Sequence, residues 1–114
     1  MTDLDRKMAE VMGWEYLPYI VNKPTFTIIA GLVILSRGNG FEIWAPSTDI
    51  SQAFEVVEVM RGKGFYYDAY SMENGSHVWV FKKHKDNPVL RRPGIADTPE
   101  MSIVLAAEKA MEGE

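Results

Sequence analysis

Two histidines and a few carboxylates are the side chains of this 114-residue chain best suited to acid–base or metal chemistry. His77 stands close in sequence to Tyr70 and Trp79, and a histidine in such a strand-like segment more often packs or hydrogen-bonds than catalyses. His84 and Asp86 are two residues apart, but a catalytic zinc site takes three protein ligands. Cysteine is absent, which excludes thiolate ligands and a cysteine nucleophile. We therefore predict no metal site and no cofactor.

Asp68 lies within an aromatic segment, FYYDAYS, where a carboxylate removed from water would suit general acid or base chemistry. The more ordinary interpretation is an edge position, or a pair with a nearby lysine, and we favour it. Asp68, Tyr70, His77 and Trp79 are the pocket candidates of the chain. P-loop and nucleophile-elbow patterns are absent from the sequence. We predict that the protein is not an enzyme.

The strongest local charge is a basic cluster in residues 82–92, made of Lys82, Lys83, Lys85, Arg91 and Arg92. Such a cluster can hold the phosphates of a nucleic acid or an acidic protein surface. Lysines also protect strand ends against edge pairing, and here they would lie in a solvated loop. The formal net charge of −4 weakens the attraction for nucleic acid. We favour the solvated loop and keep nucleic-acid binding through 82–92 as the alternative.

The chemistry depends on the elements that position these residues, and the segment 46–65, PSTDISQAFEVVEVMRGKGF, has the clearest helix signals. Ser47 or Asp49 can cap its start, because a short side-chain oxygen satisfies an orphan amide. Gly62 and Gly64 predict its end. The helix is expected to pack on a sheet through one apolar stripe, formed by Ile50, Ala53, Phe54, Val57 and Met60.

Two further helices are predicted, one over residues 2–12 that ends at Gly13 and one that begins after Thr98, with Pro99 at its first position. Residues 14–21 predict a strand interrupted by Pro18. The apolar run 25–36 fits a strand covered on both faces, although a buried helix fits its periodicity too. Gly31 marks a bulge or a break within this run. A third strand is expected over 41–45.

The dipeptide Asn74-Gly75 predicts a two-residue type I′ hairpin loop, because both central residues of that turn need a positive φ. This register pairs Tyr70 with Trp79 and Asp68 with Phe81. One face then carries Tyr66, Tyr70, Trp79 and Phe81, and the other carries Tyr67, Ala69, Val78 and Val80. Since both faces are apolar, we expect cover on both sides. Residues 82–97 are predicted to form a polar loop.

These elements predict an α+β protein of a single domain, residues 1–114, in the order α-β-β(-β)-α-β-β-α. We expect a mainly antiparallel sheet flanked by helices, an α/β/α sandwich. The segments EVMGWEY (10–16) and EVMRGKGFYY (58–67) echo each other as helix end, glycine, aromatic and strand, which indicates a shared structural solution. The longest apolar run is about half of the roughly 20 residues that span a membrane, and the N-terminus lacks a signal-peptide core, so a cytoplasmic location is expected.

Three segments together resemble the phage ABA sandwich domain family: residues 46–65, MGW at 12–14, and TPEMSIVLAAEKAM at 98–111. Members of this family are small proteins of phages and prophages of Firmicutes with a helix/sheet/helix sandwich. The sequence departs from the family pattern in 23–41, where a long apolar run replaces a short strand and a Pro-Asp-Gly-like turn. The pairing of that segment therefore stays open. The resemblance implies a fold and carries over no catalytic residues.

The resemblance and the missing catalytic constellation lead to one functional expectation. The protein is expected to be a non-enzymatic phage or prophage accessory protein of the host cytoplasm, acting through protein binding or self-association. Its expected partner is a host or phage protein or a second copy, with nucleic acid as the less favoured alternative and no membrane.

Overall fold

A computed structural model of the protein describes residues 2–18, 25–37, 40–83 and 92–112. Within these residues the chain forms three helices and seven strands. The helices are α1 (Thr2–Val11), α2 (Ile50–Gly62) and α3 (Pro99–Glu112). The strands are β1 (Glu15–Tyr16), β2 (Thr25–Ile29), β3 (Leu32–Arg37), β4 (Gly40–Ile43), β5 (Tyr66–Ser71), β6 (His77–Lys82) and β7 (Gly94–Ala96).

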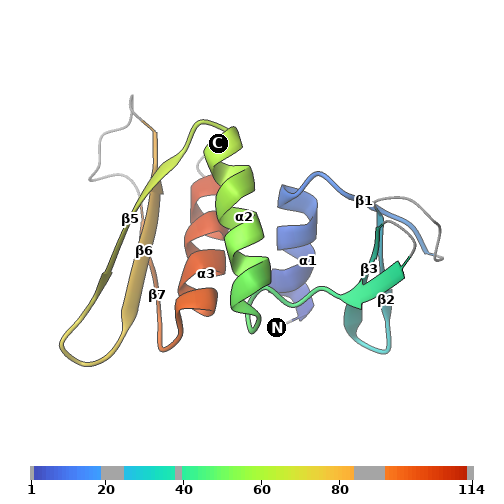
Figure 1. Ribbon diagram of the computed structural model, residues 1–114, viewed down its shortest axis with the longest axis horizontal. Coiled ribbons are helices and arrows are strands. Elements are labelled where there is room, and N and C mark those ends of the chain that lie inside the picture. The colour runs from blue at the N-terminus through green and yellow to red at the C-terminus, as the bar shows by residue number, and fades with distance from the viewer. Residues whose placement is uncertain (1, 19–24, 38–39, 84–91, 113–114) are drawn as a thin grey trace.

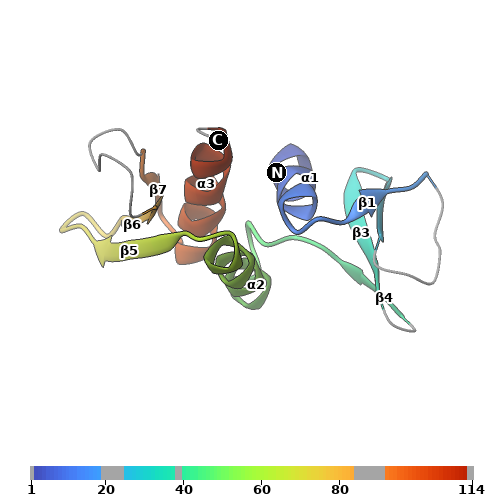
Figure 2. The same cartoon turned by 90° about the horizontal axis from the view of Figure 1, so that it is seen from above.

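The helices form a layer with one sheet on either side of it, as Figures 1 and 2 show. The first sheet has the strand order β1-β2-β3-β4 and the second has the order β5-β6-β7. The α+β class, the helices flanking mainly antiparallel strands and the predicted element order are confirmed. The arrangement differs from the expected one in a single respect: the strands divide into two sheets, and the helices lie between them.

The apolar run 25–36 is a hairpin of two strands, β2 and β3, joined by Ala30 and Gly31. Both turn residues have a positive φ, 51° and 80°, as a type I′ turn requires. Gly31 therefore marks the break that the sequence indicated. The alternative interpretation of residues 25–36 as a buried helix is wrong. Strand β4 pairs with β3 in antiparallel, and β1 pairs with β2 in parallel.

The hairpin of β5 and β6 has a three-residue loop, and the predicted two-residue type I′ loop is wrong. The Met72 amide donates to the Ser76 carbonyl at 2.9 Å, and the Gly75 amide donates to the Met72 carbonyl at 3.0 Å. Gly75 alone of the predicted turn pair has a positive φ, which is the pattern of a turn followed by a glycine bulge. The Asn74 Oδ1 accepts a hydrogen bond from the Ser76 amide at 3.0 Å, which stabilises this loop.

The longer loop shifts the register of the hairpin by one residue. Ala69 lies opposite Trp79, Tyr70 opposite Val78 and Asp68 opposite Val80. The predicted pairs are wrong, and a one-residue slip exchanges the faces of one strand relative to the other. The face toward the helices carries Tyr67, Ala69, Trp79 and Phe81, and the outer face carries Tyr66, Asp68, Tyr70, Val78 and Val80.

The third strand of this sheet, β7, falls inside the segment that was predicted to be a polar loop. It pairs with β6 and lies against α3. A Cβ on Gly94 would collide with the carbonyl oxygen of Ser102 and the amide nitrogen of Ala106, so only glycine fits here. The Ser102 Oγ lies 2.7 Å from the Gly94 carbonyl oxygen and 3.1 Å from that of His77, which ties both strands to α3.

Helix α2 begins where the sequence predicts, because the Asp49 side chain accepts a hydrogen bond from the Gln52 amide at 3.1 Å. Its packing differs from the prediction. Ile50 and Phe54 are 38% and 47% exposed, and the buried apolar residues are Ala53, Val56, Val57 and Met60. The buried face of the helix is turned toward α3 instead of a sheet, as the neighbouring positions of the two helices in Figure 2 indicate.

The predicted echo between residues 10–16 and 58–67 is a shared helix end. Gly13 and Gly64 have φ of 86° and 96°. In each case the amide of the next aromatic residue, Trp14 or Phe65, donates to the carbonyl five residues earlier, at 3.3 and 3.1 Å. This is the Schellman motif, which satisfies the last carbonyls of a helix. Helices α1 and α2 therefore end with the same motif, and each is followed by a strand.

Candidate functional site

The four predicted pocket residues lie on opposite faces of the second sheet. Asp68 and Tyr70 point away from the helices, and Tyr70 is 60% exposed. His77 and Trp79 belong to the other face, which packs on the helix layer. A β-sheet separates side chains on its two faces, so these four cannot line one pocket.

Asp68 is paired with a lysine, as its ordinary interpretation predicts. The Lys82 Nζ donates to the Asp68 Oδ2 at 2.5 Å, and this hydrogen bond raises the pKa of Lys82. The pair spans β5 and β6 on the outer face, where the Asp68 carboxylate is more than half exposed. A carboxylate that is solvated and already paired with an ammonium group is a structural charge.

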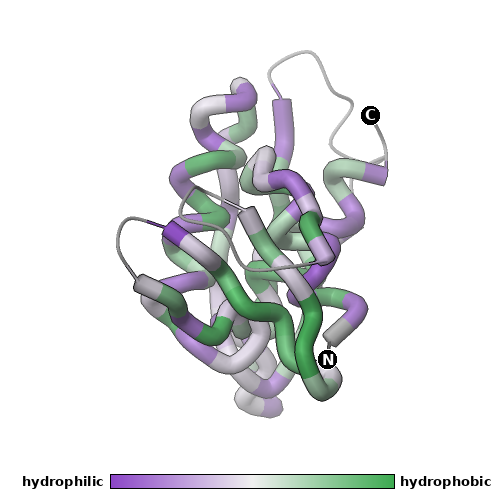
Figure 3. Tube along the Cα trace, turned by 90° about the vertical axis from the view of Figure 1, so that its right-hand side faces the viewer, coloured by the Kyte–Doolittle hydropathy of each residue, from purple (hydrophilic) through white to green (hydrophobic). Residues whose placement is uncertain are grey.

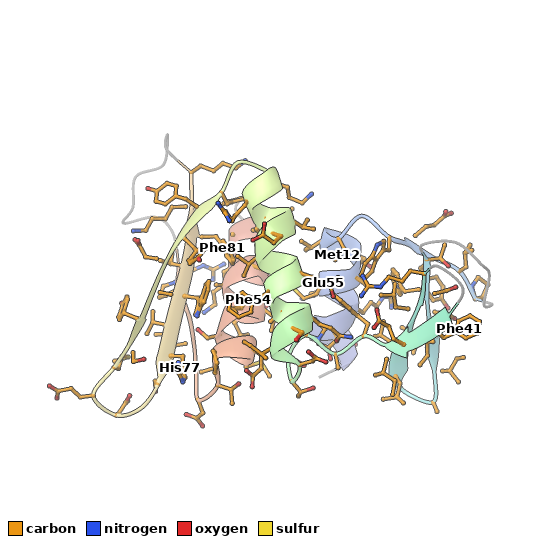
Figure 4. The ribbon with its side chains drawn as sticks, in the orientation of Figure 1. Met12, Phe41, Phe54, Glu55, His77 and Phe81 are labelled. Carbon is orange, nitrogen blue, oxygen red and sulfur yellow. The ribbon has the colours of Figure 1, made fainter. Side chains whose placement is uncertain are left out.

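His77 and Trp79 take part in packing. His77 is half-buried between Ser71 and Ala96 in the sheet. Trp79 is 8% exposed and stacks on the ring of Tyr67, with the ring centres 4.6 Å apart. The rings of Phe54 and Phe81 also lie close, with centres 6.1 and 6.4 Å from that of Trp79, and Phe54 points from α2 toward the second sheet in Figure 4.

The described residues of the basic cluster are engaged within the chain. Lys82 holds Asp68, and the Arg92 Nη2 lies 2.9 Å from the Glu112 Oε2. The Lys83 Nζ lies 4.7 Å from the centre of the Phe65 ring, which is a cation–π contact. The two ion pairs, Lys82 with Asp68 and Arg92 with Glu112, offset part of the positive charge that a phosphate backbone would need. His84, Lys85, Asp86 and Arg91 fall outside the described residues.

The sequence analysis missed two polar contacts between distant segments: one joins α1 to the turn before α2, and the other joins the first sheet to α2. Asp5 is buried, and its carboxylate accepts hydrogen bonds from the amide and the hydroxyl of Ser47, both at 3.0 Å. Burial raises the pKa of Asp5. Arg37 forms a bidentate ion pair with Glu55 of α2: its Nη1 donates to Oε1 at 2.7 Å and its Nη2 donates to Oε2 at 3.2 Å. Neither contact has a sequence signal, because the partners are far apart in the chain.

The largest feature that points to a partner is the outer face of the first sheet. The register places five apolar side chains of β2, β3 and β4 on the face away from the helices, and we call them the first-sheet surface: Ile29, Leu32, Ile34, Phe41 and Ile43. Four of them are about half exposed or more, from 47% for Leu32 to 62% for Phe41. Figure 3 turns this end of the molecule to the viewer and shows hydrophobic stretches along the nearest strands.

The first-sheet surface carries no charge. Every outward position of β2, β3 and β4 is apolar or a hydroxyl residue, the latter being Thr25, Thr27 and Ser36. The expectation that this segment would be covered on both faces is therefore wrong for the half near the Ala30-Gly31 turn. The near-continuous apolar sequence supplied both a buried face and an exposed one, and periodicity alone could not separate them.

The sequence profile of the phage ABA sandwich domain matches residues 7–107 of the chain. The protein belongs to the phage ABA sandwich domain family. The match runs from α1 into α3 and so includes both sheets of this phage ABA sandwich protein. None of the curated proteins and none of the solved structures compared with it matches the chain.

Within the described residues, neither a metal-binding cluster nor a membrane-spanning helix is present. No three metal-ligating side chains gather within these residues. Among the helices described, none has the length and apolar character to cross a membrane. The first-sheet surface is thus the most distinctive feature that the described part of the molecule presents.

Proposed function

We propose that this phage protein is a non-enzymatic accessory protein of the host cytoplasm that acts by binding a host or phage protein, or by self-association. One observation carries the proposal: the uncharged, exposed first-sheet surface. A contiguous apolar patch exposed on a protein surface often marks a site where another molecule binds. Interface centres are also depleted in charged residues and enriched in aromatic residues such as Phe41.

The position of the surface supports a protein partner over a small ligand. It lies on strands whose opposite face supplies Phe26, Val33 and Leu35 to the core. The sheet is therefore a rigid support, which lowers the entropy lost when a partner binds. An exposed apolar sheet face matches another protein surface better than it matches a small molecule, which needs a concave pocket.

A capture experiment with matched variants tests the proposal. Ile43 on the first-sheet surface is 53% exposed, and Ile95 on the second sheet is 50% exposed. The immobilised protein, its Ile43→Glu variant and its Ile95→Glu variant are each incubated with lysate of phage-infected host cells, and the captured proteins are quantified by mass spectrometry. We expect Ile43→Glu to lower capture of a specific partner about tenfold or more, because it buries a charge in the interface.

Ile95→Glu should leave that capture unchanged, since it adds the same charge at the same exposure elsewhere. Circular dichroism of both variants checks that they keep the fold. Equal capture by the two variants would contradict the role of the first-sheet surface. Failure to capture any partner at all stages of infection would contradict protein binding itself.

A further inference from the structure

The second sheet ends in an unusually open edge strand, β5. It pairs with β6 on one side, and in the described residues no strand pairs with its other side. All six residues of β5 are exposed. An edge strand is normally protected by proline, lysine, a bulge or a short length. Strand β5 has none of these, its one charged side chain, Asp68, is paired with Lys82, and its pairing with β6 is continuous from Tyr66 to Ser71.

The hydrogen-bonding groups that β5 directs outward can be derived from its hairpin. The Met72 amide bonds to Ser76, so residues 72 and 76 form a hydrogen-bonded pair. Hydrogen-bonded and non-hydrogen-bonded pairs alternate along an antiparallel ladder. Residues 66, 68 and 70 therefore direct their backbone groups toward β6. The amides and carbonyls of Tyr67, Ala69 and Ser71 point to the open edge.

We propose that this edge pairs with β5 of a second copy, in antiparallel and centred on Ala69. This register places Ala69 opposite Ala69 of the second copy, and Tyr67 opposite Ser71. All three outward-directed residues of each strand then meet outward-directed residues of the other. The two sheets join into one of six strands about a two-fold axis, which is the symmetry of most homodimers.

The side chains fit the same register. On the outer face Asp68 lies opposite Tyr70 of the second copy, so no two like charges face each other across the strands. Asp68 is also balanced by its own Lys82. An extended peptide from another protein could use the backbone edge equally well, but the symmetric register needs no second sequence to match it.

An exposed aromatic side chain beside the edge favours the added strand, and we call it the aromatic shelf. Phe54 of α2 is 47% exposed and lies next to Tyr67 and Trp79 on the helix side of the sheet. In the proposed register the second copy places its Ser71 opposite Tyr67 and its Ala69 opposite Ala69 on this side, while its own Tyr67 lies farther along, opposite Ser71. Small side chains can pass over the Phe54 ring and cover it. The sequence predicted that Phe54 would be buried. In the proposed dimer, the added strand would cover its exposed ring.

The interface is small, because six residues and one aromatic shelf bury less than the roughly 800 Å² per partner of a standard interface. We therefore expect a dissociation constant of roughly micromolar order. The inference rests on the self-association named in the proposed function and not on the first-sheet surface, so the two can fail separately.

The first experiment uses the absence of cysteine in the chain, which gives a background free of disulfides. Ala69→Cys places a cysteine on the two-fold axis, where the Cα atoms of a hydrogen-bonded pair are about 5.5 Å apart and within disulfide reach. Mild oxidation should convert Ala69→Cys to a covalent dimer on a non-reducing gel. The control Phe41→Cys, on the exposed edge of the first sheet, should stay monomeric under the same oxidation.

The second experiment tests the register with two variants of Tyr70. Tyr70→Glu sets a carboxylate opposite Asp68 twice in each dimer, and we expect it to weaken dimerisation about tenfold in analytical ultracentrifugation. Tyr70→Lys sets an ammonium group there and should keep the dimer within about twofold of the natural chain. Thermal unfolding of both variants confirms that the monomer fold persists, since Tyr70 is exposed.

Several results would overturn the inference. One is a natural chain that stays monomeric at roughly a hundred times the expected dissociation constant. Another is a dimer that Tyr70→Glu and Tyr70→Lys affect equally. A third is cross-linking through Phe41→Cys and not Ala69→Cys, which would move self-association to the first sheet. Capture of a partner that depends on Ile43 would still support the proposed function in each of these cases.

Discussion

The two sheets are attached to the same helix layer by different kinds of contact. The second sheet approaches α3 at backbone distance through Gly94, and the Ser102 hydroxyl binds carbonyls of both β6 and β7. The first sheet is held by polar side chains that reach across, namely Arg37 of β3 to Glu55 and Gln52 of α2 to the Ile43 carbonyl oxygen of β4. Close packing leaves no room for an added atom, whereas long side chains tolerate small shifts.

The sheets also differ in what they leave exposed. The first sheet exposes an apolar face and the second exposes a strand edge with its backbone groups. A face recognises side chains and an edge recognises a strand of any sequence. The two proposed modes of association, packing on a face and pairing at an edge, correspond to this difference.

The core of the second sheet should be the most sensitive to truncation. Phe81 is 1% exposed, and Phe81→Ala is expected to lower the free energy of unfolding by about 3–5 kcal/mol, because it leaves a cavity. Phe41→Ala, on the outer face of the first sheet, should cost about 0.5 kcal/mol or less. Urea denaturation of both variants measures the two values. Similar losses would show that the outer face of the first sheet is buried in solution.

The backbone contact of β7 with α3 should make one glycine irreplaceable. Gly94→Ala is expected to lower the free energy of unfolding by about 1–3 kcal/mol, since its methyl group collides with the backbone of α3. Gly40→Ala in β4 is the matched control, because no atom lies within 4 Å of the added Cβ. Thermal unfolding compares them. Equal melting temperatures would contradict the close docking of the second sheet.

The turn of the first sheet should be open to improvement. Ala30 has a φ of 51°, a conformation that costs an L-residue with a Cβ about 1–2 kcal/mol. Asparagine followed by glycine is the preferred pair for this turn, so Ala30→Asn should raise the free energy of unfolding by about 1 kcal/mol. Ala30→Val is the opposing control and should lower it. A destabilised Ala30→Asn variant would contradict the type I′ turn.

The smallest effect concerns the buried carboxylate of Asp5, which joins α1 to the turn before α2. Burial raises the pKa of Asp5 above its ordinary value of 3.8, so the folded protein keeps a proton that the unfolded chain has released. The contribution of Asp5 to stability is thus greatest at low pH and is lost as the pH rises through the folded pKa.

Replacing Asp5 by asparagine removes this titration. The difference in unfolding free energy between Asp5→Asn and the natural chain should therefore shift in favour of the variant as the pH rises from about 4 to about 7. Denaturation series at several pH values measure it. A difference that does not change with pH would contradict the burial of Asp5.

The predicted hairpins show where sequence reasoning loses information. Asn74-Gly75 has the preferred composition for a type I′ turn and does not form one, whereas Ala30-Gly31 lacks it and does. In the first case the Asn74 side chain bonds to the Ser76 amide within a longer loop. In the second, tight pairing of β2 with β3 compensates the strain at Ala30. The wrong turn then placed Tyr70 and Trp79 on one face, whereas the structure puts them on opposite faces.

The candidate site was the least predictable part. The sequence analysis selected polar residues that stand near aromatic residues in the chain. In the structure, Asp68 and His77 lie on opposite faces of the sheet, and Asp68 is paired with Lys82. The surfaces that now carry the proposals depend on exposure and on strand order. Both are set by which elements pack together, and no local pattern reports them.

The sequence by itself determined the helix boundaries, the class and the family. Asp49 and Thr98 cap α2 and α3 with their side chains, and Gly13 and Gly64 end α1 and α2. These signals are readable because each cap is satisfied within about six residues of chain. Tertiary structure decided the division into two sheets, the exposed apolar face and the open edge of β5. Those depend on contacts between distant segments, and their free energy exists only once the helix layer has formed between the sheets.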